Sequence, residues 1–417
     1  MKVVIASIVL PYPLTSGGAQ GVFNMVEELR HDNQITLIFP ENAGNTLAAM
    51  RELQRLWPEV DLRPYSYARQ MRHPRFVFDK AIRAFNLHFR PNSHSFRVHR
   101  LLDHYGYYMT RDFRSFLQGI IDQKQPDIVQ VEFYPYLKVI DLIQTDAKRI
   151  FVHHELRRVR NERFLQGLTL TPRQQKLRDF IAHEEVSDLN KYDAVVALTD
   201  IDHHTLLRQG VTAPLYTSPL AISTPTLRPK RWNGRLLFVG GFDHTPNQEG
   251  LRWLLSEVLP RIDWNIPGMA TGLDVAGKGW SEEWIAKANS SSVKVNLLGF
   301  VEHLEDVGHG SIMVVPILSG SGMRMKILEG AALATPIVTT SVGVEGIGLS
   351  HEQSCLIADT PQTFADALSR LMANADLRHQ LCTAAQEIYE SNYSRLALSK
   401  RRYEIWEKVI EVKKVKR

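Results

Sequence analysis

Short apolar segments alternate with amphipathic ones in two successive series along the chain. The first series opens with an apolar strand over 3–9, a Pro/Gly-rich loop, a helix over 22–29 and a second strand over 34–40. This is the order of a βαβ unit, in which a helix connects two parallel strands. A second series starts with the apolar segment 235–241, after a Pro-rich passage over 217–232. The pattern therefore predicts an α/β protein with two doubly wound parallel sheets joined by a linker.

Composition agrees with two cores and narrows the cellular setting. The chain has 417 residues, of which 44% are hydrophobic. A chain of this length usually forms more than one hydrophobic core. Its 50 Lys and Arg barely exceed its 45 Asp and Glu, so overall charge does not indicate a nucleic-acid partner. Cys355 and Cys382 are too few for a disulfide framework, and no apolar run approaches the roughly 20 residues of a membrane span. We expect a cytoplasmic protein.

A glycine-rich loop in the second series predicts an anion site. The segment "GSGMRMKILEG", residues 320–330, follows an apolar strand over 311–317 and opens a helix that stops before Pro336. Gly320 and Gly322 let this loop adopt positive φ. The loop delivers a helix N-terminus to the carboxyl end of a parallel strand, where unpaired N–H groups and the helix dipole favour phosphate.

Three charged residues in the same segment extend this interpretation. Arg324 and Lys326 would add positive charge to a phosphate pocket, and Glu329 shares a helix face with Lys326 and suits the hydroxyls of a ribose. These residues predict a site for a nucleoside diphosphate. The alternative is an exposed Lys–Glu pair on a helix, and such pairs are far commoner than ligand sites.

Five blocks of the second half follow one another along the chain: "FVGGFDHTPNQEGLRWLLSEVLP", "LDVAGKG", "VNLLGFVEHLEDV", "VVPILSGSGMRMKILEGAALATPIVTTSVGVEGI" and "CLIADTPQTFADALSRLM". They cover most of 235–395. Their order and spacing resemble those of glycosyltransferase family 4, the retaining group 1 glycosyl transferases of GT-B fold. The first half resembles the family more loosely, through "YPLTSGGAQ", "VHHE" and "YDAVVALTDID".

The resemblance implies the GT-B architecture, with two Rossmann-like domains facing across a cleft. On this basis 1–216 is the acceptor-binding domain, 217–232 the linker, 233–395 the nucleotide-sugar-binding domain and 396–417 a helix that packs back on the first domain. The implied activity is that of a hexosyltransferase, which moves a sugar from a nucleoside-diphosphate sugar to a hydroxyl of a glycan or lipid-linked acceptor, with retention and without a metal or other cofactor. Cell-surface polysaccharide or glycolipid synthesis is the implied setting.

The resemblance also implies individual donor-binding residues. Glu329 corresponds to the family's ribose ligand, the backbone at Phe300 and Val301 would hold the base, and 341–347 is expected to line the same site. The full predicted set is Gly17, Gly18, Gly241, Phe300, Val301, Gly320, Ser321, Gly322 and Glu329. Three of them have a simpler explanation: Gly17 and Gly18 also suit an ordinary tight turn, and Phe300 also suits the core.

Two departures from the family pattern affect this site. The family signature has two glutamates separated by seven residues, and Ser321 stands where the first glutamate would contact the transferred sugar. Many members also carry an Arg and a Lys after the strand at 235–241, where this chain has Gly241 or Phe242 and then Asn247. Arg324 and Lys326, expected on the opposite side of the phosphate pocket, are the predicted substitutes, since a departing diphosphate needs positive charge.

A histidine completes the predicted catalytic set of His153, Lys326 and Arg324. His153 and His154 end an apolar segment over 149–154, and a histidine at this place in the family lies close to the reacting sugar. We favour His153 for that role, with His154 in the place of the acidic or amide residue that often follows. The alternative is a strand-end histidine that bonds only within the protein.

Residues 69–100 combine many Arg and His with interleaved phenylalanines. Such a surface suits peripheral contact with an anionic membrane, which would place the protein at the inner face, or a lipid-diphosphate acceptor. RNA binding is the rival interpretation, but no other feature of the sequence supports nucleic acid. An ordinary insertion that packs its aromatic residues inward remains an equal alternative.

Two other functions fit the same fold. A nucleotide-sugar epimerase would need no acceptor, and Ser321 raises the alternative of an inactive paralogue that only binds nucleotide sugar.

Overall fold

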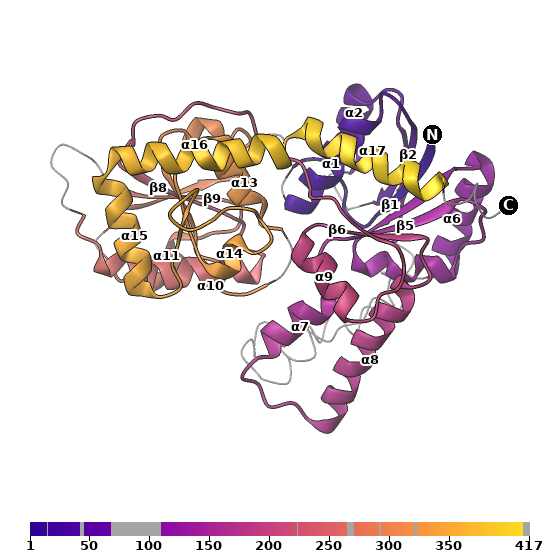
Figure 1. Ribbon diagram of the computed structural model, residues 1–417, viewed down its shortest axis with the longest axis horizontal. Helices are drawn as coiled ribbons and strands as arrows, with labels where there is room; N and C mark the ends of the chain where they lie inside the picture. Colours follow the sequence, from indigo (N-terminus) through magenta and orange to yellow (C-terminus); the bar gives the residue numbers. More distant parts are fainter. Residues whose placement is uncertain are drawn as a thin grey trace. The chain divides into compact units, whose positions relative to one another are not determined.

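The computed structural model describes residues 1–14, 16–41, 46–67, 110–222, 224–264, 271–291, 293–320 and 323–411. The chain divides into two compact units (Figure 1): Met1–Pro219 with Ser399–Arg417, and Leu220–Leu398. The segment after Pro219 joins the second unit, where the Leu227 N–H donates to the Ala332 carbonyl at 2.9 Å. The predicted membrane-contact segment, 69–100, lies outside the described residues.

The first unit contains a seven-stranded parallel sheet in the order β3-β2-β1-β4-β5-β6-β7. Its strands are β1 (Lys2–Ser7), β2 (Gln34–Pro40), β3 (Asp61–Tyr65), β4 (Ile128–Glu132), β5 (Lys148–His153), β6 (Ala194–Ala197) and β7 (Leu215–Thr217). The central strands are buried on both faces, as in Val3, Val4 and Ile5, which is why they appear as continuous apolar runs.

Helices cover the first sheet and connect its strands. They are α1 (Gly17–Leu29), α2 (Thr46–Leu56), α6 (Arg111–Lys124), the 3₁₀ helix η2 (Tyr134–Asp141), α7 (Arg157–Leu165), α8 (Pro172–Leu189), α9 (Asp200–Arg208) and α17 (Arg395–Glu411). The last of these, α17, contacts the unit through Arg402 and Trp406, both buried. Trp406 donates its indole N–H to Gln130 on β4, and Arg402 donates to Ser218.

The second unit contains a six-stranded parallel sheet in the order β10-β9-β8-β11-β12-β13. Its strands are β8 (Arg235–Val239), β9 (Gly272–Ala276), β10 (Val295–Gly299), β11 (Ile312–Val315), β12 (Ile337–Thr339) and β13 (Leu356–Ile357). Its helices are α10 (Thr245–Trp253), continued by η3 (Leu254–Val258) and η4 (Leu259–Arg261), then α11 (Glu282–Ala288), α12 (Glu305–Gly308), α13 (Met325–Ala332), α14 (Ser341–Val344), α15 (Pro361–Ala373) and α16 (Ala375–Asn392). The two sheets confirm the predicted α/β class with two Rossmann-like domains.

The start of α1 corrects one prediction. The sequence predicts the helix from residue 22, but α1 begins at Gly17, because Ser16 caps it and accepts the Ala19 N–H at 3.2 Å. Gly17 and Gly18 therefore lie in the first helical turn rather than in a loop. A Cβ at Gly18 would lie 3.0 Å from the ring of Phe133, so the glycine permits this close packing.

No helix within the described part of the chain combines the length and apolarity needed to cross a bilayer.

Candidate functional site

The strand order of the second unit creates a switch point between β8 and β11. From β8 the chain proceeds outward to β9 and β10, and from β11 it proceeds in the other direction to β12 and β13. The loops that leave β8 and β11 therefore diverge and open a crevice beyond the carboxyl ends of these strands, which is where ligands bind in open α/β sheets. The loop at 316–324, singled out from the sequence, lies at this crevice.

Glycines let the loops after β8 and β9 approach each other closely. Gly240 has φ +156°, and a Cβ there would meet the side chain of Asn247 at 2.6 Å. A Cβ at Gly277, with φ +150°, would lie 2.2 Å from the Gly240 carbonyl oxygen. Asn247, in turn, donates from Nδ2 to the Gly241 carbonyl at 2.9 Å. These contacts fix Asn247 beside the crevice and use its amide NH₂, which leaves its amide oxygen as an acceptor.

Lys326 reaches this amide oxygen from α13. Its Nζ donates to Oδ1 of Asn247 at 2.8 Å and lies 5.3 Å from the ring centroid of Phe238. Burial lowers the pKa of Lys326 to about 8, with Glu329 opposing this shift and Arg324 adding to it. The sequence placed Lys326 and Asn247 on opposite sides of the phosphate pocket, but the structure brings them into direct contact. Lys326 thus supplies positive charge beside the loop after β8, which itself contains no Lys or Arg.

Arg324 is the second cation of the crevice. It occupies the N-cap position of α13 and supplies no side-chain acceptor for the first-turn N–H groups. The guanidinium is buried, donates from Nη2 to the Gly320 carbonyl at 3.2 Å, and places Nη1 3.9 Å from Glu345. Gly320 has φ +107°, so the glycine is required for the loop to turn this carbonyl toward Arg324.

Glu329 is buried on α13, one turn beyond Lys326. The alternative of an exposed, solvated Lys–Glu pair is therefore wrong. Ser321 and Gly322, also predicted to bind the donor, lie outside the described residues.

His244 adds a titratable group that the sequence analysis missed. It is the N-cap residue of α10, and its side chain does not cap that helix either. His244 is exposed to solvent, yet the surrounding protein atoms, followed by the positive charge of Lys326, lower its pKa to about 4. Two helix N-termini and two cations consequently converge at one crevice, an arrangement suited to a multiply charged anion.

The predicted base-binding segment follows β10. Phe300 is 39% exposed, so the alternative that it belongs to the core is wrong. Nζ of Lys278 lies 4.6 Å from the centroid of its ring. Gly299 adopts φ +66° and its carbonyl accepts the Gly277 N–H at 2.7 Å, which joins this segment to the loop after β9. Val301 is half-buried.

The two histidines at the end of β5 in the first unit differ in their surroundings. The side chain of His153 is fully buried, with Nε2 2.9 Å from Oε1 of Glu185 on α8. Glu185 also accepts the backbone N–H groups of Arg157 and Arg158 at the start of α7. His153 therefore bonds within the protein through Nε2, whereas its buried Nδ1 has no hydrogen-bond partner among the described residues, and its catalytic role stays a prediction.

His154, by contrast, is partly exposed. Its Nε2 lies 2.5 Å from Oε2 of Glu132, and its ring stacks on Phe133 at a centroid distance of 3.7 Å. Glu132 ends β4 and pairs in register with Ser7 at the end of β1, and these strands flank the switch point of the first sheet.

Comparison with known proteins gives this geometry a family context. Residues 233–374, within the second unit, match the family model described as glycosyl transferases group 1. Over 414 residues the chain is 22% identical to the "Uncharacterized 44.6 kDa protein in cps region" of Klebsiella pneumoniae, covering 94% of this chain and 96% of that protein. It is 29% identical to "Glycosyltransferase 1 domain-containing protein 1" of Xenopus tropicalis over 91 residues, 22% of this chain and 26% of that protein.

Solved structures show the same fold at low sequence identity. TarM of S. aureus, solved with fondaparinux, alpha-GlcNAc-glycerol and UDP, superposes with a TM-score of 0.65 at 12% identity, covering 97% of this chain and all (100%) of that one. Sucrose-phosphate synthase from Thermosynechococcus elongatus gives 0.69 at 13%, covering 99% and 100%. Anabaena HepE, solved with UDP and glucose, gives 0.67 at 9%, covering 98% and 100%. The fold is GT-B, and with the group 1 match it supports a glycosyltransferase.

Several residues of the crevice were not identified as site residues from the sequence. Asn247 was noted only as a departure from the family, whereas here it receives Lys326. His244 precedes Asn247 within a block already quoted for the resemblance. The resemblance of that block was the sequence signal that could have identified both residues. Glu249 accepts the Ser319 hydroxyl at 2.6 Å and ties α10 to the loop after β11.

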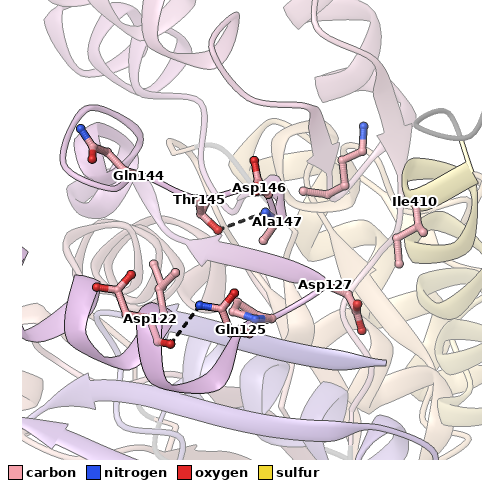
Figure 2. A pocket seen from close by; sticks show the side chains of 11 residues that line it. Asp122, Gln125, Asp127, Gln144, Thr145, Asp146, Ala147 and Ile410 are labelled. Carbon is pink, nitrogen blue, oxygen red and sulfur yellow. Dashed lines mark hydrogen bonds between the residues drawn. The ribbon is translucent and has the colours of Figure 1, made fainter. Parts of the chain in front are cut away.

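A separate cavity of about 510 Å³ opens in the first unit at the amino ends of β4 and β5 (Figure 2). Its lining includes Asp127, Asp146, Ala147 and Ile410. Asp127 already accepts the backbone N–H of Lys2 at 2.7 Å. Because it lies at the end of the strands opposite to the switch point, we assign this cavity no part in the candidate site.

Proposed function

We propose that this protein is a retaining glycosyltransferase that moves a hexosyl group from a nucleoside-diphosphate sugar to an acceptor hydroxyl. The observation that carries the proposal is the convergence of Arg324, Lys326 and the N-termini of α10 and α13 at the switch point of the second unit. A diphosphate bound there would lie against two cations as its bond to the sugar breaks. Stabilisation of that developing charge is the main contribution a transferase of this kind needs.

The remaining donor contacts follow from the same crevice. Glu329, buried on α13, would accept hydrogen bonds from ribose hydroxyls, and the segment at Phe300 and Val301 would contact the base. Solved neighbours of this fold contain UDP, in one case with glucose. We therefore propose a uridine diphosphate sugar as the first donor to test.

The acceptor and the cellular setting belong to the proposal as well. We propose a glycan or lipid-linked acceptor in polysaccharide or glycolipid synthesis, with the protein working in the cytoplasm at the inner face of the membrane and without a metal. The Klebsiella pneumoniae relative whose name places it in a cps region matches 94% of this chain, although its name states no activity.

Incubation of the protein with UDP-, GDP- and ADP-sugars, with and without added glycan or lipid acceptors, tests the activity. We expect nucleoside diphosphate release that rises when a suitable acceptor is present, and an anomeric configuration in the product equal to that of the donor. Conversion of the donor to a different sugar without an acceptor would instead establish an epimerase. Binding of donor without any turnover across the panel would establish an inactive paralogue.

A further inference from the structure

A continuous set of hydrogen bonds connects the C-terminal helix to the switch point of the first unit. On α17, Nε1 of Trp406 donates to Oε1 of Gln130 at 2.9 Å. Gln130, on β4, donates from Nε2 to Oε1 of Glu132 at 2.5 Å. The other oxygen of Glu132, Oε2, lies 2.5 Å from Nε2 of His154. Trp406, Gln130 and Glu132 are all buried, so water does not compete for these bonds.

The chemistry of each group fixes the direction of the whole series. An indole N–H can only donate, so the atom of Gln130 that faces Trp406 must be its oxygen. The amide NH₂ then faces Glu132 and donates to it. An ionised carboxylate can only accept, so the remaining oxygen of Glu132 requires a donor from His154. When the imidazole is neutral, its proton is therefore held on Nε2, and Nδ1 keeps its lone pair.

A buried cation on the same helix interacts electrostatically with Glu132. Arg402, one turn before Trp406 on α17, is buried and donates to the hydroxyl and the carbonyl of Ser218 at 3.3 and 3.4 Å. Burial lowers the pKa of Arg402, and the negative charge of Glu132 opposes that shift. Helix α17 thus supplies both the indole N–H of Trp406, which sets the direction of the series, and the positive charge of Arg402, which opposes the negative charge of Glu132.

Packing holds the ring of His154 in one orientation. Its plane is inclined by only 18° to the ring of Phe133. Phe133 itself adopts φ +71°, which is uncommon for a residue with a side chain, and its ring packs where Gly18 has no Cβ. Nδ1 of His154 makes no hydrogen bond with the described residues, and about 8% of the side-chain surface is exposed.

We propose that Trp406 and Gln130 are positioning residues that, through Glu132, keep the proton of His154 on Nε2 and present Nδ1 as a hydrogen-bond acceptor for a substrate hydroxyl. The substrate part rests on the proposed glycosyl transfer, in which hydroxyl groups of the donor sugar or the acceptor are the available donors. The position of the proton does not depend on that function. The C-terminal helix thereby helps to build a site at the carboxyl edge of the first sheet.

The position of the proton can be measured by NMR on protein labelled with ¹⁵N-histidine. Pyridine-type and pyrrole-type ring nitrogens have well-separated ¹⁵N shifts, and a His154→Gln variant identifies the relevant signals among the 16 histidines. At pH 8.5 we expect a single tautomer with the proton on Nε2. A ring protonated on Nδ1, or on both nitrogens, would overturn the proposal.

Two variants test the direction of the series, and one controls for lost bonding in general. In Glu132→Gln the new amide would turn its NH₂ to His154, so the proton should move from Nε2 to Nδ1. Trp406→Phe keeps the buried ring but removes the donor, and should convert the single tautomer into a mixture. Trp57→Phe removes another buried indole N–H, which donates to Glu27 at 2.5 Å in the same unit, and should leave His154 unchanged. An unaltered tautomer in both test variants would refute the positioning role.

Activity gives an independent second measurement. In Trp406→Phe we expect kcat to fall at least about tenfold with little change in the KM for the nucleotide sugar, as for loss of an oriented catalytic contact. A normal kcat with the tautomer changed would overturn the contact between Nδ1 and substrate. Absence of turnover in the unmodified protein would count against the proposed function, while the NMR result would still decide the position of the proton.

Discussion

In the first unit the switch point between β1 and β4 ends in a buried carboxylate that bonds a histidine, whereas in the second unit the switch point between β8 and β11 ends in two cations. Both crevices arise from the same arrangement of parallel strands. The side chains at the strand ends therefore decide which part of a substrate each can bind. A diphosphate suits the cationic crevice, and hydroxyl groups suit the one with Glu132 and His154.

Removal of the Lys326 ammonium should have the largest effect on this contrast. Lys326→Met keeps an unbranched side chain, one atom shorter, but leaves the departing diphosphate with one cation, so we expect turnover to fall about 100-fold or more. Nucleoside diphosphate release measures it. Lys287→Met is the matched control, because the Lys287 side chain is 75% exposed and pairs with Glu283 on α11. Near-normal turnover in Lys326→Met would refute the assignment of the cationic crevice.

Arg324→Lys should have a smaller effect, since it preserves the charge but loses the guanidinium geometry. The guanidinium spans the Gly320 carbonyl and Glu345, and an ammonium cannot reach both in the same way. We expect donor affinity to fall about tenfold, as measured by calorimetry. Arg370→Lys, which alters an exposed pair with Glu352 in the same unit, should bind donor normally. Equal affinities in the two variants would show that Arg324 acts only as a point charge.

The pH dependence of donor binding should distinguish the two crevices further. Lys326 has a pKa of about 8 in the free protein, and a bound diphosphate would favour its charged form. Below pH 8 the ammonium is already present, whereas above pH 8 binding must take up a proton. Affinity should therefore fall about tenfold per pH unit above 8, until the pKa of the complex is reached.

Lys326→Arg provides the control for this pH profile. Arginine stays charged throughout the range, so its donor affinity should be flat between pH 7 and pH 9. A sloping profile in Lys326→Arg would assign the pH dependence to another group.

The sequence allowed the two sheets to be predicted because their central strands are buried on both faces and appear as apolar runs. The edge strands β3, β7 and β13 were missed, since β3 contains Asp61, Arg63 and Pro64, β7 has only three residues and β13 has only two. Paired glycines suggested a loop before α1, although Ser16 caps a helix there. Local propensity was too weak a guide at these places because tertiary pairing and capping decide the structure.

The candidate site was predictable only where its residues lie close together in the chain. Arg324, Lys326 and Glu329 share one segment, so their helix geometry was evident. The contact of Lys326 with Asn247 joins residues 79 positions apart, and that of Trp406 with Gln130 joins residues 276 apart. Such contacts depend on strand order and leave no periodic pattern in the sequence.

The smallest expected effect concerns the packing under His154. Alanine normally stabilises a helix interior relative to glycine by about 0.5–1 kcal/mol, and Gly119→Ala in α6 should show this gain because a Cβ there meets nothing within 4 Å. Gly18→Ala should gain less or lose stability, since its Cβ would press on Phe133 at 3.0 Å and disturb the stack with His154. Urea denaturation measures both free energies of unfolding. Equal gains would mean that Phe133 moves freely. The ring of His154 would then lack rigid support, and an oriented histidine would no longer distinguish the first switch point from the second.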